Sequence, residues 1–153
     1  MFGKKLAELR NEMPVLARHE GRWQGEYVHT NSSGKIIDQH NSVLSCDFPT
    51  KGEFPYYQIN RYHWADGRSE ELHFPGLYRD HRIWWDNERI KGCAWEIDHR
   101  SVMLTWVRKD SPDSYLYEMI QISDNNNRRV RTWHWFSNDK LVQRTLINET
   151  RAD

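Results

Sequence analysis

The sequence predicts an all-β fold, a closed antiparallel up-and-down β-barrel of about eight to ten strands with a short N-terminal helix. Beyond Gly21, apolar and polar residues alternate with the period of a β-strand. Segments rich in Gly, Asn, Asp and Pro interrupt this pattern about every ten residues, as turns do in a meander. An open meander would leave two strand edges exposed, and closure into a barrel removes them. A β-sandwich is the alternative.

The first expected element is a helix within the segment KKLAELRNEMPVLARHE. Four of its apolar residues recur at helical spacing: Leu6, Leu9, Met13 and Leu16. Pro14 breaks or kinks this helix, so a second short turn should lead to Gly21. We therefore expect residues 1–20 to form a helical segment that caps the barrel, and residues 21–153 to form a single β-barrel domain.

The strands follow from the runs of Val, Ile, Thr, Tyr and Trp between the turn segments. They are expected at residues 21–31, 35–47, 54–64, 68–75, 76–79, 82–86, 89–97, 101–109, 114–123, 128–137 and 140–150. The two short runs before residue 80 can also form one bent strand.

Charge and composition restrict the class of protein. Lys+Arg and Asp+Glu both number 22, so the net charge is zero, which argues against a nucleic-acid or anionic-membrane partner. The N-terminal segment is charged where a signal peptide is apolar, and no apolar run reaches membrane-spanning length. We expect a soluble, cytoplasmic protein, with a homodimer left open. Cys46 and Cys93 are too few and too scattered for a disulfide framework or a zinc site, and are expected to be reduced.

Aromatic residues are unusually frequent in a polar chain. Eight Trp, seven Tyr and five Phe make up 13% of the residues, while the mean hydropathy is −0.95. An aromatic-lined interior inside a polar surface would explain both values, and so would an exposed aromatic binding face.

The segment GRWQGEY, residues 21–27, resembles the opening strand of the calycin superfamily, which contains the lipocalins and the fatty-acid-binding-like barrels. Gly21, Trp23 and Gly25 match its Gly-x-Trp opening after a short helix. In that superfamily the Trp plugs the closed end of the barrel beneath an Arg from the last strand, and Arg151 stands at this place here. The resemblance thus implies a cation–π contact between Arg151 and Trp23. In length and strand count the chain is most similar to nitrobindin-like and DUF3598-type barrels.

The resemblance implies a fold and leaves the function open, because calycins include carriers, haem proteins and enzymes. Nitrobindins hold haem through a histidine near the chain end, and this chain has no histidine after His134. We therefore expect no cofactor, haem being the one group that the resemblance leaves open. No metal site is expected either.

The last three strands present two candidate interior faces. Tight turns at residues 125–126 and 138–139 would place Tyr117 opposite His134, and His134 opposite Gln143. The first face carries neutral groups and one histidine: Tyr115, Tyr117, Met119, Gln121, Thr132, His134, Phe136, Leu141, Gln143, Thr145 and Ile147. The second face carries charges: Leu116, Glu118, Ile120, Arg129, Arg131, Trp133, Trp135, Val142, Arg144 and Leu146. The cost of burying charges favours the first face as interior. In the alternative, Arg131 and Arg144 would grip a ligand carboxylate inside.

A hairpin turn at Asp66–Gly67 predicts a second candidate wall. This turn sets Asn60 opposite His73, so that one face is polar and aromatic together, as ligand pockets are. It carries Gln58, Asn60, Tyr62, Trp64 and His73. In the other interpretation Ile59, Leu72 and Phe74 form the core, and both interpretations stay open.

These faces supply the candidate functional residues. The predicted ligand-binding residues are Trp23, Tyr27, Gln58, Asn60, Tyr62, Tyr115, Phe136, Gln143, Arg131 and Arg144. The predicted acid–base residues are His134, Tyr117 and His73, because a neutral histidine bonded to a tyrosine can move a proton near neutral pH.

Three functional hypotheses result. The preferred one is binding of a small hydrophobic or aromatic ligand in an aromatic-lined polar cavity. The second is a cofactor-free lyase or isomerase acting on an aromatic or conjugated small molecule in the same cavity. The third is a protein-interaction barrel that uses exposed rows of Trp and Arg at residues 131–135.

Overall fold

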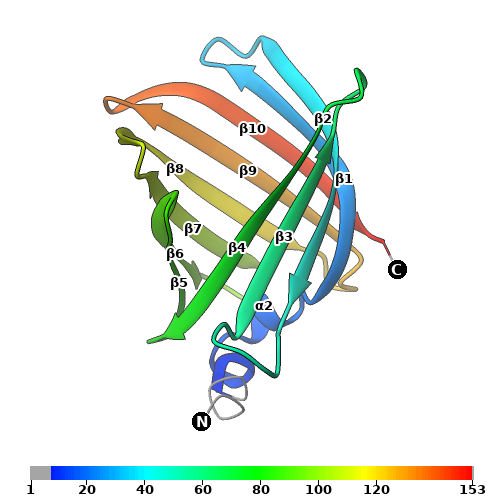
Figure 1. Ribbon diagram of the computed structural model, residues 1–153. Coiled ribbons are helices and arrows are strands. Elements are labelled where there is room, and N and C mark those ends of the chain that lie inside the picture. Colours follow the sequence, from blue (N-terminus) through cyan, green and yellow to red (C-terminus); the bar gives the residue numbers. More distant parts are fainter. Residues whose placement is uncertain (1–7, 153) are drawn as a thin grey trace.

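Ten antiparallel strands close into a barrel in the computed structural model, which describes residues 8–152 (Figure 1). Each strand pairs with the next, and the last pairs with the first, so the predicted barrel is confirmed and the sandwich is not formed. The strands are β1 (Gly21–Asn31), β2 (Ile36–Asp47), β3 (Tyr56–His63), β4 (Ser69–Arg79), β5 (Arg82–Asp86), β6 (Ile90–Glu96), β7 (Ser101–Arg108), β8 (Ser111–Ile122), β9 (Arg128–Ser137) and β10 (Lys140–Arg151).

The strand pairing in the barrel is shortest between β4 and β5. The two short runs before residue 80 form one strand, β4, which pairs with β5 only through Leu77, Tyr78 and Arg79. The rest of β4 pairs with β3 on its other edge. The first part of β4 is therefore not paired with the β5–β6 hairpin, and the two are separated in the barrel wall.

The N-terminal segment lies under the lower end of the barrel (Figure 1). Residues 8–12 are helical and are followed by α2 (Pro14–Ala17). Leu9, Met13 and Leu16 are buried in the barrel core, as their spacing predicts, whereas Leu6 lies outside the described residues. Glu96, at the end of β6, accepts a hydrogen bond of 2.7 Å from the backbone N–H of Leu16. Among residues 8–152, no helix is both long enough and apolar enough to cross a membrane.

Trp23 closes the lower end where β1 meets β10. Its side chain is fully buried, and its Nε1–H donates to the carbonyl oxygen of His19 at 2.9 Å. Arg151 pairs with Trp23 across the strands, and its guanidinium lies 4.3 Å from the centroid of the indole. The predicted cation–π contact is therefore confirmed, and Arg129 makes a second one at 4.7 Å.

The charged face of β8 and β9 lies inside the barrel. Tyr117 is opposite His134, as the turn predicts, but both side chains are exposed. Glu118 and Arg131 are 1% and 3% exposed, and Trp133 is also buried. The preference for the neutral face as interior is thus wrong, because the buried charges pair with one another.

A β-bulge changes the register of β10. The turn at Asn138–Asp139 is tight, as predicted, with a positive φ at both residues. A register shift follows between Leu141 and Gln143, so His134 faces Arg144 and not Gln143. Gln143, Thr145 and Ile147 of β10 consequently face inward, whereas Arg144 is exposed on the outer wall.

The β3–β4 hairpin is also one residue longer than the predicted turn. Trp64 and Arg68 flank it, and Gly67 has a φ of 93°. Leu72 therefore lies opposite Asn60, and His73 moves to the outer wall. The prediction of a polar and aromatic inner face is therefore right for β3, whereas β4 adds the apolar residues Leu72 and Phe74 to this face.

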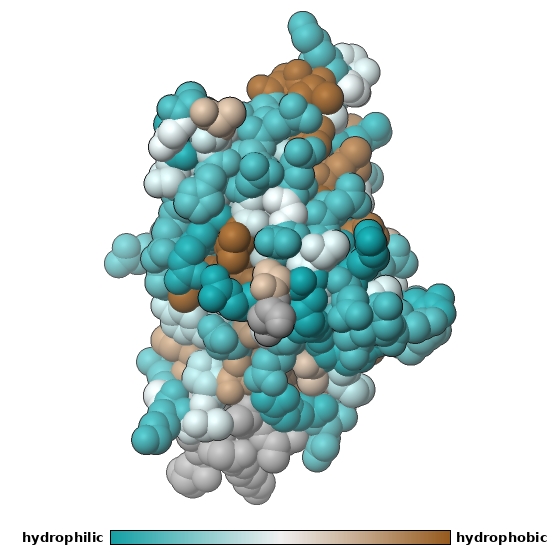
Figure 2. Space-filling view, turned by 90° about the vertical axis from the view of Figure 1, so that its right-hand side faces the viewer, coloured by the Kyte–Doolittle hydropathy of each residue, from teal (hydrophilic) through white to brown (hydrophobic). Residues whose placement is uncertain are grey.

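The outer wall is mainly polar. The side of the barrel that lies to the right in Figure 1 is largely hydrophilic, with hydrophobic residues gathered toward its upper end (Figure 2). Two exposed isoleucines, Ile36 and Ile37, belong to the start of β2.

Candidate functional site

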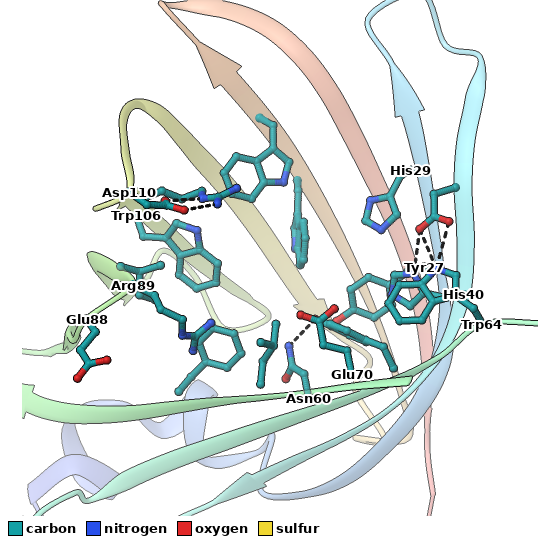
Figure 3. Close-up of a pocket in the computed structure, with 18 residues that line it drawn as sticks. Tyr27, His29, His40, Asn60, Trp64, Glu70, Glu88, Arg89, Trp106 and Asp110 are labelled. Carbon is teal, nitrogen blue, oxygen red and sulfur yellow. Dashed lines mark hydrogen bonds and ion pairs between the residues drawn. The ribbon is translucent and has the colours of Figure 1, made fainter. Parts of the chain in front are cut away.

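The upper half of the barrel encloses a cavity of about 500 Å³ (Figure 3). Its walls are aromatic, polar groups gather at its two ends, and a buried ionic network lies next to it and contacts Tyr27 of the wall. The lining residues are Tyr27, His29, Asp38, His40, Asn60, Tyr62, Trp64, Glu70, Leu72, Phe74, Glu88, Arg89, Ile90, Trp106, Arg108, Asp110, Trp133 and Trp135.

The buried ionic network is built around Arg131, which lines a second, smaller pocket together with Glu118 and Arg129. Its Nε donates to Glu118 at 2.5 Å, and its Nη1 donates to the hydroxyl of Tyr27 at 2.8 Å and lies 3.5 Å from Glu149. Arg129 binds the other oxygen of Glu149 at 2.7 Å. Burial alone would lower the pKa of Arg131, but the charge of Glu118 raises this pKa well above its ordinary value. Arg131 is thus already engaged with protein carboxylates.

The walls are formed by indole and phenyl rings. Trp106 stacks on Phe74, with the ring centroids 5.5 Å apart and the planes at 6°. Trp133 packs edge-on against Tyr27 and Trp135. The indole N–H groups of Trp106 and Trp133 are buried and have no hydrogen-bond partner among the described residues. Two donors are therefore left unsatisfied at the cavity, which is rare in a folded protein.

One end of the cavity holds two histidines and a carboxylate from β1 and β2. His40 lies with its Nδ1 at 3.4 Å from Asp38, and its ring stacks on that of Tyr27 at 4.8 Å. Trp64 donates its indole N–H to both oxygens of Asp38, at 3.1 and 3.0 Å. Burial lowers the pKa of His29 and of His40 below the ordinary value, so both are neutral at pH 7.

The other end lies at the separation between β4 and the β5–β6 hairpin. Arg89 bridges this separation, because its Nη2 donates to the backbone oxygen of His73 at 2.7 Å and its guanidinium lies 5.1 Å from the ring of Phe74. Arg108 is paired with Asp110 nearby. In Figure 3 Arg89 and Asp110 lie at the end of the cavity opposite His29.

The predicted ligand-binding residues divide between the interior and the outer wall. Tyr27, Asn60 and Tyr62 line the cavity, and Arg131 lies behind Tyr27, to whose hydroxyl it donates. Trp23 is fully buried at the closed lower end of the barrel.

Gln58 and Gln143 also face inward. Gln58 donates to the side-chain oxygen of Asn60 at 2.9 Å and is partly buried. Gln143 lies 3.0 Å from Nδ1 of His29.

The remaining predicted residues lie outside. Tyr115 and Phe136 stack on each other on the outer wall, where Arg144 is exposed. The predicted acid–base residues Tyr117 and His134 share this wall.

His73 is likewise on the outer wall, bonded to Tyr57 at 2.9 Å and to Glu71 at 2.8 Å. The prediction that Trp and Arg at residues 131–135 form exposed rows is wrong, because Arg131 and Trp133 are buried.

Sequence reasoning missed His29, Asp38 and His40. The turn NSSGK, which joins β1 to β2, signals that His29 lies near Asp38, and a register shift between His29 and Thr30 sets the two residues opposite each other. Asp38 and His40 then share one face at a spacing of two.

Comparison with solved structures shows the same fold at low sequence identity. A protein of unknown function of the DUF3598 family from Nostoc punctiforme PCC 73102 matches with a TM-score of 0.68 and 12% identity, over 90% of this chain and 49% of that one. The chain therefore spans about half the length of the Nostoc protein.

Two further structures match over nearly their full length. The S-type phycobiliprotein lyase CPES from Guillardia theta gives a TM-score of 0.74 at 13% identity, over 92% of both chains. Rv2717c from M. tuberculosis gives 0.63 at 11% identity, over 93% of this chain and 98% of that one.

No curated protein matches the sequence. The model of the N-terminal domain of unknown function DUF3598 matches residues 10–153, which is nearly the whole chain. The chain therefore belongs to the DUF3598 family, as its resemblance to DUF3598-type barrels predicts.

Proposed function

We propose that this protein binds a small, flat, aromatic or conjugated molecule in the cavity of the barrel. The observation that carries the proposal is a cavity of about 500 Å³ whose aromatic walls include two buried indole N–H groups without partners. Ligand pockets are typically apolar clefts of this size with a few polar groups that orient the ligand. A bound acceptor would satisfy Trp106 and Trp133 and remove the cost of leaving them unpaired.

Arg89 offers donors to a ligand with carboxylate or carbonyl oxygens, beside the carboxylates of Asp38, Glu70, Glu88 and Asp110 that also line the cavity. Arg89 and the two indole rings line the cavity. Arginine binds carboxylates well because its planar guanidinium offers several donors. Arg131 is excluded from this role, since Glu118 and Glu149 already neutralise it.

A bilin is the first ligand to test. It is an open-chain tetrapyrrole that combines a flat conjugated system with two carboxylates. The barrel from Guillardia theta, which is named a phycobiliprotein lyase, motivates this choice. At 13% identity that likeness concerns the fold, so the bilin stands for the chemical class and not for one compound.

Titration with biliverdin tests the proposal, followed by quenching of tryptophan fluorescence and by the absorption of the pigment. The variant Trp106→Ala should bind about tenfold more weakly, because a stacking surface is lost. Trp84→Ala is the matched control, since Trp84 lies outside the cavity and donates to the backbone oxygen of Arg79 at 3.0 Å. Equal weakening in both variants, or no saturable binding to the wild type, would contradict the proposal.

Acid–base catalysis in the same cavity is a second candidate, and the placement of His29 favours it. His29 is half-buried, neutral at pH 7 and held through Nδ1 by the hydroxyl of Thr145 at 2.7 Å. A histidine in this state can accept a proton from a bound ligand, as a cofactor-free lyase or isomerase requires. A catalyst would lose turnover in His29→Gln while it keeps its affinity for the ligand, and a carrier would show no turnover in either form.

A further inference from the structure

We propose that His29, His40 and Asp38 form a binding site for a divalent transition metal ion, with Zn²⁺ as the first choice, at one end of the cavity. One ligand atom from each of the three side chains lies within 4.8 Å of the other two. Two imidazoles and one carboxylate are a common donor set for zinc and its neighbours in the first transition row.

The β1–β2 hairpin brings the three side chains together. His29 lies directly opposite Asp38 in the antiparallel pairing, and His40 follows Asp38 by two residues on the same face. The two imidazole centroids are 5.2 Å apart. Figure 3 shows His29 and His40 side by side at one end of the cavity, with Trp64 next to them.

Neighbouring side chains hold the proposed ligands in place. Trp64 donates to both oxygens of Asp38, and the hydroxyl of Thr145 lies 2.7 Å from Nδ1 of His29. Metal-binding histidines usually have their second ring nitrogen fixed in this way, which orients the first toward the ion. For His29 this contact leaves Nε2 for the metal.

His40 supplies a second, independent observation. Its side chain is only 4% exposed, and its Nε2 has no hydrogen-bond partner among the described residues. A buried ring nitrogen without a partner costs free energy that a bound metal would recover.

Small side-chain rotations would complete the geometry. With bonds of about 2.1 Å, the ligand atoms of a tetrahedral zinc site are roughly 3.4 Å apart. The ligand atoms of the three side chains now lie within 4.8 Å of one another. Three protein ligands leave a coordination position free, as in catalytic zinc sites, and this position would face the cavity. Metal binding itself does not depend on the proposed function, whereas a role for the free position does.

The test uses the chelator-treated protein, without a polyhistidine tag and without any organic ligand. Titration with ZnCl₂ by calorimetry, and with CoCl₂ by visible absorption, should show one equivalent bound with a Kd below about 100 µM. His29→Gln and Asp38→Asn should each weaken binding by on the order of 100-fold, and Trp64→Phe by about tenfold. Circular dichroism establishes that each variant is folded.

His73→Gln is the matched control. His73 also lies beside a carboxylate, that of Glu71, but on the outer wall and outside the one three-residue group of metal-binding side chains found among residues 8–152. The proposal requires unchanged zinc affinity in this variant. It is overturned if the wild type binds zinc more weakly than about 100 µM, or if His73→Gln loses as much affinity as His29→Gln. Biliverdin binding measured without metal decides the proposed function separately.

Discussion

Replacing Arg131 by methionine should destabilise the barrel strongly. Glu118, which is 1% exposed, would lose the guanidinium that lies 2.5 Å from it, and Tyr27 would lose a hydrogen-bond donor at 2.8 Å. Glu149 would keep Arg129 as its partner. Removing one partner of a buried ion pair costs about 3–5 kcal/mol, because the other charge stays buried without compensation. For a domain of this size that corresponds to a fall in Tm of about 6–20 °C.

Urea unfolding, followed by tryptophan fluorescence, measures the change in the free energy of unfolding. Arg61→Met is the control, since Arg61 and Glu71 form an ion pair of similar length, 2.9 Å, whose side chains are 38% and 49% exposed. This exposed pair should contribute less than about 1 kcal/mol. The double variant Arg131→Met with Glu118→Leu should recover much of the lost stability, because it removes the uncompensated charge. The reasoning is refuted if Arg131→Met costs no more than Arg61→Met.

Three further predictions concern other parts of the barrel. Burial and the charge of Arg129 hold the pKa of His19 well below its ordinary value, so below about pH 6.5 the unfolded chain binds a proton that the folded chain does not. The free energy of unfolding should therefore fall as the pH drops from 7 to 5, and urea titrations of His19→Gln should show a shallower fall. Glu96→Ala removes the acceptor for the N–H of Leu16, and urea unfolding should show a loss of about 1 kcal/mol. Gly25→Ala would place a Cβ only 2.0 Å from a backbone oxygen of β10, and its Tm should fall as expected for a loss of about 1–3 kcal/mol.

Local patterns predicted the architecture well. The alternation of apolar and polar residues and the spacing of the turns place the ten strands close to their observed bounds. The pairing of Trp23 with Arg151 follows from barrel closure, because the start of the first strand must then meet the end of the last. Each of these features depends on residues near in sequence, or on the single topological condition that the sheet closes.

The wall that faces the cavity was harder to predict. A burial rule applied to one strand at a time places Glu118 and Arg131 outside, since each is costly inside when alone. They pair across β8 and β9 and reach Glu149 on β10, and no single strand carries this compensation. One extra residue in β10 and one in the β3–β4 hairpin reverse the side on which the following residues point.

The sequence by itself therefore determined the barrel, its strands and the closure of its lower end. Sequence reasoning also found Tyr27, Asn60 and Tyr62, but the tertiary structure decided which other residues share the cavity. It brings His29 and Asp38 of one hairpin beside Trp64 at the end of β3, and Arg89 beside Phe74 across the separation in the wall. The physical reason is that strand periodicity is local, whereas register and the pairing of buried charges depend on neighbouring strands, whose residues can be distant in sequence.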